Sequence, residues 1–253
     1  HSWLPDAYES ADTAVSIMLS GIVTKIAGVY SLIVLVQLFP GNVALKVTLL
    51  VLGLFTIVVG ALLALRQKNF KRIAAYSSVS QMGYLLLGLA ADTRLGLIAA
   101  LLYLLMHALA KTALFTNAAA LEKRLGTLDI DEMGGLQARM PVTSFSSVAA
   151  LLSIAGVPPL AGFWSKLLVL IALWGAGLPG VAAAALLLSI LSGAYFLRLQ
   201  KKAFFGELNP RWEGVREITG GIKVSEILLT IATLAIGLLF PLVLLYLQHA
   251  GLV

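Results

Sequence analysis

Three lysines lie inside long apolar stretches of this 253-residue sequence. Lys25, Lys111 and Lys166 each have mostly hydrophobic neighbours on both sides. A cation at the centre of a lipid bilayer costs about 3 kcal/mol or more, so ionisable residues at such depth usually serve a function. Because an amine removed from water can exchange its proton with a nearby group, these residue types indicate a proton relay.

One of these lysines has polar neighbours at helical spacing. His107 precedes Lys111 by four residues, and Tyr103 precedes His107 by four. In a helix the three side chains form a stripe about 12 Å long on one face. Other polar residues in apolar segments are candidates for lining a hydrated path. They are Thr24, Ser77, Ser78, Ser80 and Gln81.

Structural roles for these residues are the alternative interpretation. A single buried lysine serves equally well as an interhelical hydrogen-bond donor, and a lone histidine is more often packed than catalytic. Three lysines and a histidine together favour the relay. The twelve acidic residues fall in loops or at the ends of apolar segments, so the lysines are expected to lack carboxylate partners within this chain. The same distribution argues against a metal site.

The composition indicates a membrane protein. Hydrophobic residues make up 60% of the chain and charged residues 12%, whereas soluble domains have about 45–50% and about 25%. A soluble enzyme and a disordered chain are therefore excluded. The absence of cysteine excludes disulfides and thiolate metal sites.

A transmembrane helix needs about 20 mostly apolar residues, and the sequence predicts an all-α polytopic protein with seven such spans. The fifth span is too long for one straight helix and is broken at Pro158-Pro159, because proline cannot continue the hydrogen-bond ladder. The seven spans are expected at 13–37, 43–65, 73–91, 95–121, 142–174, 180–200 and 224–247.

Lysines and arginines between the spans gather on one side. That side carries thirteen of them, and the other side carries only Lys46 and Arg94. The positive-inside rule then predicts that the loops after spans two, four and six are cytoplasmic and that the C-terminus lies outside. The net charge of +6 reflects this topology, and nucleic acid is not an expected partner.

Five motifs occur in the order found in a known family. They are HSWLPDA at 1–7, LSGIVTKIAGVY at 19–30, KRIAAYSSVSQMGY at 71–84, HALAKTALF at 107–115 and AGVPPLAGFWSK at 155–166. The sequence resembles, over essentially its whole length, the antiporter-like subunits shared by respiratory complex I, membrane-bound hydrogenases and Mrp-type cation/proton antiporters.

The resemblance implies a fold of fourteen helices in two inverted repeats. Residues 1–253 would form a single transmembrane domain that corresponds to about helices 8–14, the second repeat of a longer subunit. Residues 1–12 would be the end of a preceding broken helix and its loop, and residues 13–247 the seven spans. The upstream half would carry the family's glutamate on helix five and lysine on helix seven.

The same resemblance implies roles for individual residues. Lys25 is similar to the ionisable residue of the family's helix eight. His107 and Lys111 are similar to the pair on helix eleven, and Lys166 to the lysine of the broken helix twelve. The implied function is proton translocation through these side chains.

The chain would act as a subunit of a redox-driven complex, in a bilayer and beside other membrane subunits. No cofactor is expected in this chain, because redox centres would lie in partner subunits. The expected location is a prokaryotic cytoplasmic membrane. Two alternatives remain: a subunit of an Mrp-type antiporter that exchanges sodium for protons, and a membrane scaffold without transport.

Overall fold

The computed structural model describes residues 3–249 and 251, which form helices joined by short turns. The α-helices are α1 (Trp3–Ser10), α2 (Thr13–Met18), α3 (Ser31–Gln37), α4 (Val43–Arg66), α5 (Phe70–Ala90), α6 (Arg94–Leu125), α7 (Pro141–Ala155), α8 (Ala161–Gly175), α9 (Pro179–Ala203) and α10 (Gly221–His249). A π-helix, η1 (Leu19–Tyr30), joins α2 to α3, and short 3₁₀ turns form η2 (Leu136–Ala138) and η3 (Pro210–Trp212).

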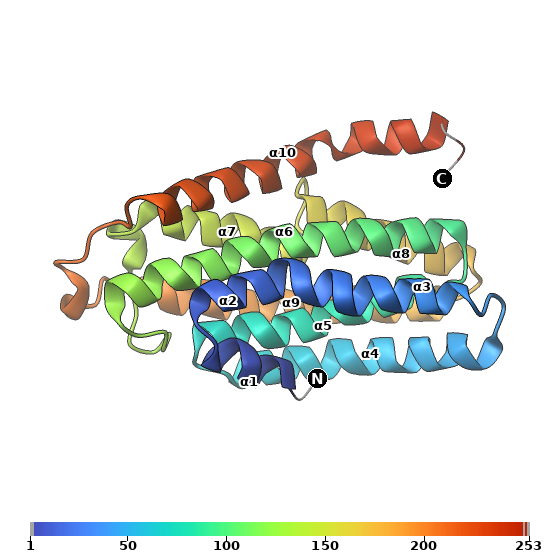
Figure 1. Ribbon diagram of the computed structural model, residues 1–253, viewed down its shortest axis with the longest axis horizontal. Coiled ribbons are helices and arrows are strands. Elements are labelled where there is room, and N and C mark those ends of the chain that lie inside the picture. Colours follow the sequence, from blue (N-terminus) through green and yellow to red (C-terminus); the bar gives the residue numbers. More distant parts are fainter. Residues whose placement is uncertain (1–2, 250, 252–253) are drawn as a thin grey trace.

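The long helices run back and forth along one axis (Figure 1). Within the described residues, six helical stretches are long and apolar enough to span a membrane, the first of them made of α2, η1 and α3 together. The shorter apolar helices α7 and α8 follow one another as the halves of a further crossing. The prediction of about seven spans with one broken is therefore confirmed.

Local sequence signals set where the helices begin. The side chains of Asn42, Asn69 and Thr93 accept hydrogen bonds from backbone N–H groups in the first turns of α4, α5 and α6. Such caps satisfy amides that have no partner inside the helix. Proline occupies the first position of α7 and α9, where its missing N–H costs nothing.

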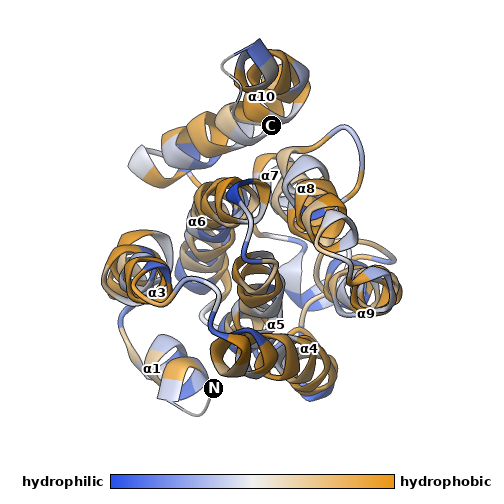
Figure 2. Ribbon diagram, turned by 90° about the vertical axis from the view of Figure 1, so that its right-hand side faces the viewer, coloured by the Kyte–Doolittle hydropathy of each residue, from blue (hydrophilic) through white to orange (hydrophobic). Residues whose placement is uncertain are grey.

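Helix α5 lies at the centre of the bundle, between α4, α6, α8 and α9 (Figure 2). Most of its residues are buried, including the polar Ser77, Ser80 and Gln81. Helix α4 approaches α5 closely: a Cβ atom at Gly60 would lie 2.8 Å from the Cα of Ser80. Small residues at such contacts let membrane helices pack backbone against backbone.

The break between α7 and α8 falls at the predicted prolines. Helix α7 ends at Gly156, whose φ of +88° is a left-handed conformation that favours glycine. Pro158 and Pro159 follow in the turn, and α8 begins at Ala161. The carbonyl groups at the end of α7 are consequently free to accept other donors.

One detail of the predicted spans is wrong. Lys71, counted as a loop residue, lies in the first turn of α5 with 3% of its surface exposed. Glu226 lies near the beginning of α10, as expected of a residue at a span end, but its complete burial was not predicted. Both helices begin about three residues before the predicted spans, α5 after its Asn69 cap and α10 at Gly221.

Candidate functional site

Lys111 is fully buried between α6 and α5. Its Nζ donates to the Ala74 carbonyl oxygen at 2.7 Å and also to the Ser77 hydroxyl. No ion pair joins it to a carboxylate among the described residues. Within the part of the chain that the structure describes, Lys111 is therefore held by neutral groups, the Ala74 carbonyl and the Ser77 hydroxyl.

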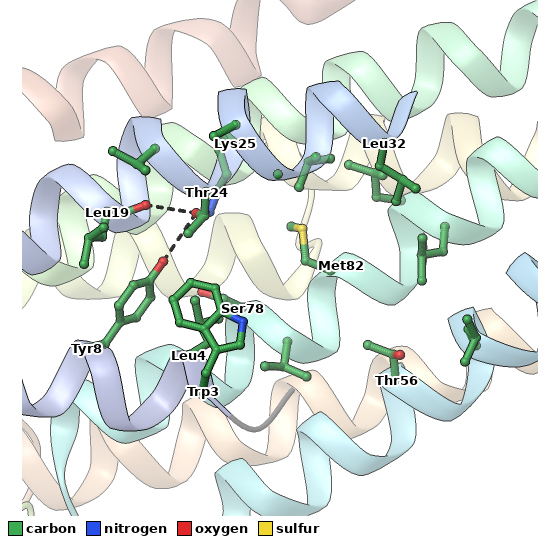
Figure 3. Close-up of a pocket in the computed structure, with 18 residues that line it drawn as sticks. Trp3, Leu4, Tyr8, Leu19, Thr24, Lys25, Leu32, Thr56, Ser78 and Met82 are labelled. Atoms are coloured by element: carbon green, nitrogen blue, oxygen red, sulfur yellow. Dashed lines mark hydrogen bonds between the residues drawn. The ribbon is translucent and has the colours of Figure 1, made fainter. Parts of the chain in front are cut away.

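Lys25 lies in the π-helix η1, a rare conformation that often occurs at functional sites. Its Nζ donates to the Thr24 hydroxyl at 3.2 Å, and the Tyr8 hydroxyl lies 3.3 Å from the same oxygen (Figure 3). These side chains border a mostly apolar pocket of about 540 Å³ between α1, η1, α4 and α5, with Ser78 on its opposite wall. The pocket therefore has polar groups at the Lys25 edge and also at Thr56 and Ser78, and its other lining side chains are mostly apolar.

Lys166 bridges the break in the fifth span. Its Nζ donates to the carbonyl oxygens of Ile154 and Ala155, both at 2.9 Å. These carbonyls end α7, where the helix dipole places partial negative charge. The amine also lies 4.8 Å from the centre of the Tyr84 ring, a cation–π distance. The lysine thus satisfies the backbone groups that the proline break leaves free.

His107 faces the same region. The ring is 3% exposed, and neither ring nitrogen has a hydrogen-bond partner among the described residues. Beside it lies a cavity of about 10 Å³, lined also by Tyr103, Ser153, Ile154 and Ser165. This volume is about that of one water molecule in a small cavity. Ile154 therefore contacts both sites: it lines the cavity beside His107, and its carbonyl oxygen accepts from Lys166.

The predicted path-lining residues divide into two groups. Gln81 is the centre of a buried network: the Tyr103 hydroxyl donates to its Oε1 at 2.5 Å, and its Nε2 donates to Tyr195 and Ser192 at 2.9 and 3.0 Å. Sequence reasoning missed Tyr195 and Ser192. Their spacing of three residues on one apolar span is a signal that could have found them.

The serine hydroxyls of α5 mostly donate hydrogen bonds to backbone carbonyl oxygens. The Ser78 hydroxyl donates to the Ala74 carbonyl, and the Ser80 hydroxyl donates to the Ile57 carbonyl. Of the predicted serines, only Ser77 contacts one of the three lysines among the described hydrogen bonds.

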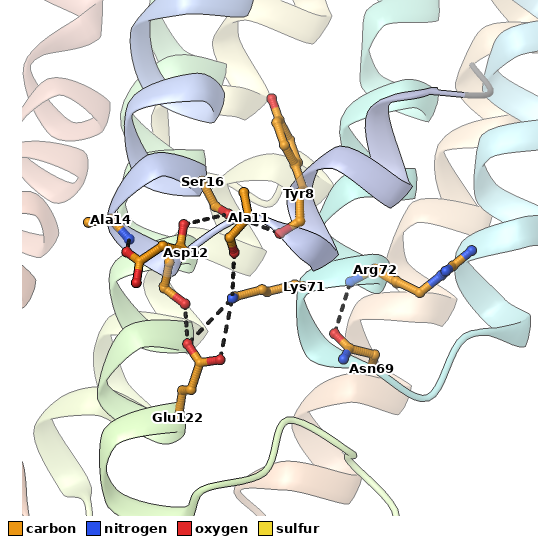
Figure 4. Close-up of polar contacts among 10 residues, drawn as sticks. Tyr8, Ala11, Asp12, Ala14, Ser16, Asn69, Lys71, Arg72 and Glu122 are labelled. Atoms are coloured by element: carbon orange, nitrogen blue, oxygen red, sulfur yellow. Dashed lines mark hydrogen bonds and ion pairs between the residues drawn. The ribbon is translucent and has the colours of Figure 1, made fainter.

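Another buried lysine, on α5, is held by charge. Lys71 Nζ lies 3.4 Å from both oxygens of Glu122 on α6 and 3.3 Å from the Ala11 carbonyl oxygen (Figure 4). The Thr13 hydroxyl bonds the same carboxylate. The cap at Asn69 is the signal that could have placed Lys71 inside the helix. This cluster ties the loop between α1 and α2 to α5 and α6.

Carboxylates at the loop end of α7 were also missed. Glu217 accepts from the backbone N–H groups of Val142 and Thr143, in the first turn of α7, at 2.6 and 3.3 Å. Its negative charge therefore sits at the positive end of that helix dipole. Helix α7 thus carries a carboxylate at its beginning and Lys166 at its end.

Outside the spans, Asp131 holds the loop between α6 and α7. It pairs with Lys202 and, at 3.0 Å, with Lys68. The hydrogen bond from Lys202, followed by that from Lys68, holds the pKa of the Asp131 carboxyl below its usual value. Among the described residues, no three His, Cys, Asp or Glu side chains are grouped as a metal site requires.

Known proteins are similar to this chain in sequence. The sequence pattern of the family described as "NADH:quinone oxidoreductase/Mrp antiporter, TM" matches residues 1–192. The "F(420)H(2) dehydrogenase subunit M" of Methanosarcina mazei is 36% identical over 241 residues, which cover 94% of this chain and 48% of that protein. The chain thus spans about half the length of the curated relatives it matches.

Solved structures are similar to this chain in fold. A chain of the Mrp complex from a Dietzia species has a TM-score of 0.89 and 30% identity, over 96% of this chain and 54% of that one. A chain of respiratory complex I from Thermus thermophilus has a TM-score of 0.79 and 29% identity, over 94% of this chain and 50% of that one. Structures of similar fold therefore include a chain of respiratory complex I, which is redox-driven, and a chain of an Mrp complex.

Proposed function

Because the chain belongs to the NADH:quinone oxidoreductase/Mrp antiporter transmembrane family, we propose that its buried lysines and histidine carry protons in an ion-translocating complex. The relay consists of Lys25, His107, Lys111 and Lys166. Each of these side chains is at most 6% exposed. Each comes from a helix of the apolar bundle, so an ionisable group there requires a functional or structural reason.

The environment of Lys111 carries the proposal. Its amine contacts a carbonyl oxygen and a hydroxyl group. A neutral amine can still donate hydrogen bonds to these groups, so neither loses its partner when the lysine gives up a proton. A lysine held by a carboxylate would lose an ion pair on giving up its proton. Lys111 loses none among the described contacts, so its proton can leave without breaking a salt bridge.

Electrostatic repulsion between neighbouring protonated groups favours the transfer of a proton from one group to the next. Two ammonium groups about 7 Å apart repel by about 2.4 kcal/mol at an effective dielectric constant of about 20. Arrival of a proton on one amine therefore favours its loss from the next. Thr24, Ser77, Gln81 and Tyr103 are the side chains that we propose line the route, together with water. Ser78 and Ser80 would line it only by releasing their backbone bonds.

The complete complex supplies the energy. We propose that residues 13–247 form one transmembrane domain in a prokaryotic cytoplasmic membrane, beside other membrane subunits. The loops after spans two, four and six would face the cytoplasm, because they carry most of the lysines and arginines. Redox cofactors would lie in partner subunits, as the name of the dehydrogenase relative suggests for its own complex.

Substitution of the relay lysines in the intact complex tests the proposal. Lys111→Ala and Lys166→Ala should each abolish most proton translocation into sealed vesicles while the complex still assembles. Lys201→Ala, at an exposed lysine, serves as the matched control. Normal translocation in both relay variants would contradict the relay and favour a scaffold without transport.

Sodium/proton exchange is a second candidate, favoured by the TM-score of 0.89 to the Mrp complex chain. The same vesicles distinguish the two candidates. Sodium-dependent proton movement without any redox substrate would indicate an antiporter. Proton movement only on addition of an electron donor and acceptor would indicate a redox-driven pump.

A further inference from the structure

A buried carboxyl group lies at the loop end of the bundle, away from the four relay residues. Glu226 of α10 is fully buried. Its Oε2 lies 3.1 Å from the Thr143 hydroxyl oxygen, and its Oε1 lies 2.8 Å from the side-chain amide nitrogen of Asn117 when that amide is oriented to satisfy its neighbours. No lysine or arginine forms an ion pair with it among the described residues.

The Thr143 hydroxyl also contacts a second carboxylate. Its oxygen lies 2.8 Å from Oε1 of Glu217. Glu217 is fixed by the α7 amides and by Ile218 N–H, which donates to Oε1 at 2.9 Å. All these partners donate to Glu217, so its contacts are those of an ionised carboxylate.

The cationic side chains near Glu217 and Glu226 either bind a backbone group or lie at the edge of this carboxylate pair. On α6, Arg124 donates to the backbone carbonyl oxygen of Glu217 at 2.8 Å. On α10, Lys223 precedes Glu226 by three residues and is half-buried. The facing side of α7 presents Thr143, Ser146 and Ser147, which carry no charge. A negative charge on Glu226 would therefore be buried without a direct counter-charge, which is strongly unfavourable.

Hydrogen-bond counting places one proton in this group. A threonine hydroxyl has one hydrogen, so it can donate to Glu217 or to Glu226 but not to both. If both carboxyls were ionised, one oxygen would face the Thr143 oxygen at close range with no proton between them. With a proton on Glu226, each of the two contacts of Thr143 has one hydrogen: Glu226 donates to Thr143, and Thr143 donates to Glu217.

We propose that Glu226 and Glu217 form a proton-loading site that exchanges one proton through the Thr143 hydroxyl. In loading, a proton on Glu217 Oε1 moves to the Thr143 oxygen as the Thr143 proton moves to Glu226 Oε2, and release is the reverse. Two O–H bonds form and two break, and no electrons are transferred. Glu217 lies in the loop before α10 and is half-buried, so it connects the buried group to the loop side of the bundle.

Helix α7 relates this site to the lysine relay, and this step rests on the proposed function. Thr143 and Ala155 are twelve residues apart, about 18 Å along the helix. Lys166 binds the Ala155 carbonyl at the far end. Buried hydroxyl groups occupy the interior between them, on Ser146, Ser147 and Ser153 of α7 and on Thr230 of α10. The site would supply protons from the loop side to the broken span.

Glu226→Gln in the intact complex tests the inference. Glutamine reproduces the protonated acid: its amide can donate to Thr143, and its oxygen can accept from Asn117. The variant should assemble normally and lose most proton translocation. Glu213→Gln is the control, because Glu213 is an exposed carboxylate four residues before Glu217. It should translocate protons at the wild-type rate.

Two further measurements keep the inference separate from the relay. Thr143→Val should lose most translocation, and Thr143→Ser, which restores the hydroxyl, should recover it. Infrared spectra of the wild-type complex should contain a protonated carboxyl band that is absent in Glu226→Gln and retained in Glu213→Gln.

The outcomes separate the two proposals. If Lys111→Ala and Lys166→Ala lose translocation but Glu226→Gln keeps it and the infrared band is unchanged, the loading site is wrong and the relay stands. If both lysine variants translocate normally, the relay is wrong, and the infrared band then decides by itself whether Glu226 holds the proton.

Discussion

Lys71 and Lys111 both bridge α5 and α6, and both are almost fully buried, yet their partners differ. Lys71 is bound by the carboxylate of Glu122, whereas Lys111 is bound by the Ala74 carbonyl and the Ser77 hydroxyl. On α5, Lys71 precedes Ser77, the hydroxyl partner of Lys111, by six residues, about 9 Å along the helix. Burial is therefore the same in both regions, and the presence of a counter-charge distinguishes them. Under the proposed relay, this difference separates a lysine that fixes structure from one that releases a proton.

The largest effect is expected from Lys111→Met. The change removes the amine but keeps an unbranched side chain of similar length, so packing should be preserved. Proton translocation by the intact complex should fall to near background, while assembly, measured by native electrophoresis, should be unchanged. Failure to assemble would show instead that Lys111 is structural, as Lys71 is.

Lys71→Met should have the opposite consequence. It leaves Glu122 and the Ala11 carbonyl without their charged donor, and the expected loss is about 1–3 kcal/mol of stability. Thermal unfolding of the complex should shift downward, and translocation per assembled complex should remain at the wild-type level. Normal stability together with lost translocation would remove the distinction between the two lysines.

A smaller effect on translocation is expected from Ser77→Ala. The hydroxyl partner of Lys111 is lost while the Ala74 carbonyl remains. The rate should fall about twofold to tenfold, because one hydrogen bond contributes about 0.5–1.5 kcal/mol. Ser20→Ala is the matched control: Ser20 is equally buried, and among the described residues its hydroxyl donates to the Ile17 carbonyl of its own span and contacts no lysine. Equal rates in the two variants would mean that Ser77 does not assist Lys111.

The smallest effect is expected outside the membrane, at Asp131. Because its folded pKa lies below the usual value, its ion pairs stabilise the loop above about pH 4 and lose this effect as the pH falls through the folded pKa. Asp131→Asn should speed hydrogen exchange of the 126–140 amides at neutral pH. The difference from wild type should disappear in acid, and a difference that grew in acid would contradict the assignment.

Sequence reasoning succeeded where the signal is local. Apolar length predicted the spans, and the prolines predicted the break, because both features act within one segment of chain. The four-residue spacing predicted a shared helix face for Tyr103 and His107, and both line one cavity. The apolar runs misplaced Lys71, because α5 begins about a turn before its run does, and they gave no sign that Glu226 is buried.

The amino-acid sequence by itself determined the membrane class, the broken span and three of the buried cations, Lys25, Lys111 and Lys166, since each follows from residue type and spacing. Tertiary structure alone decided the partners. Whether a lysine meets a carboxylate, a carbonyl or a ring depends on residues such as Glu122 and Ala74, which lie 51 and 37 positions away from Lys71 and Lys111. Charge pairing depends on a separation of a few ångströms in space, and this separation cannot be read from the number of residues between two positions in the chain.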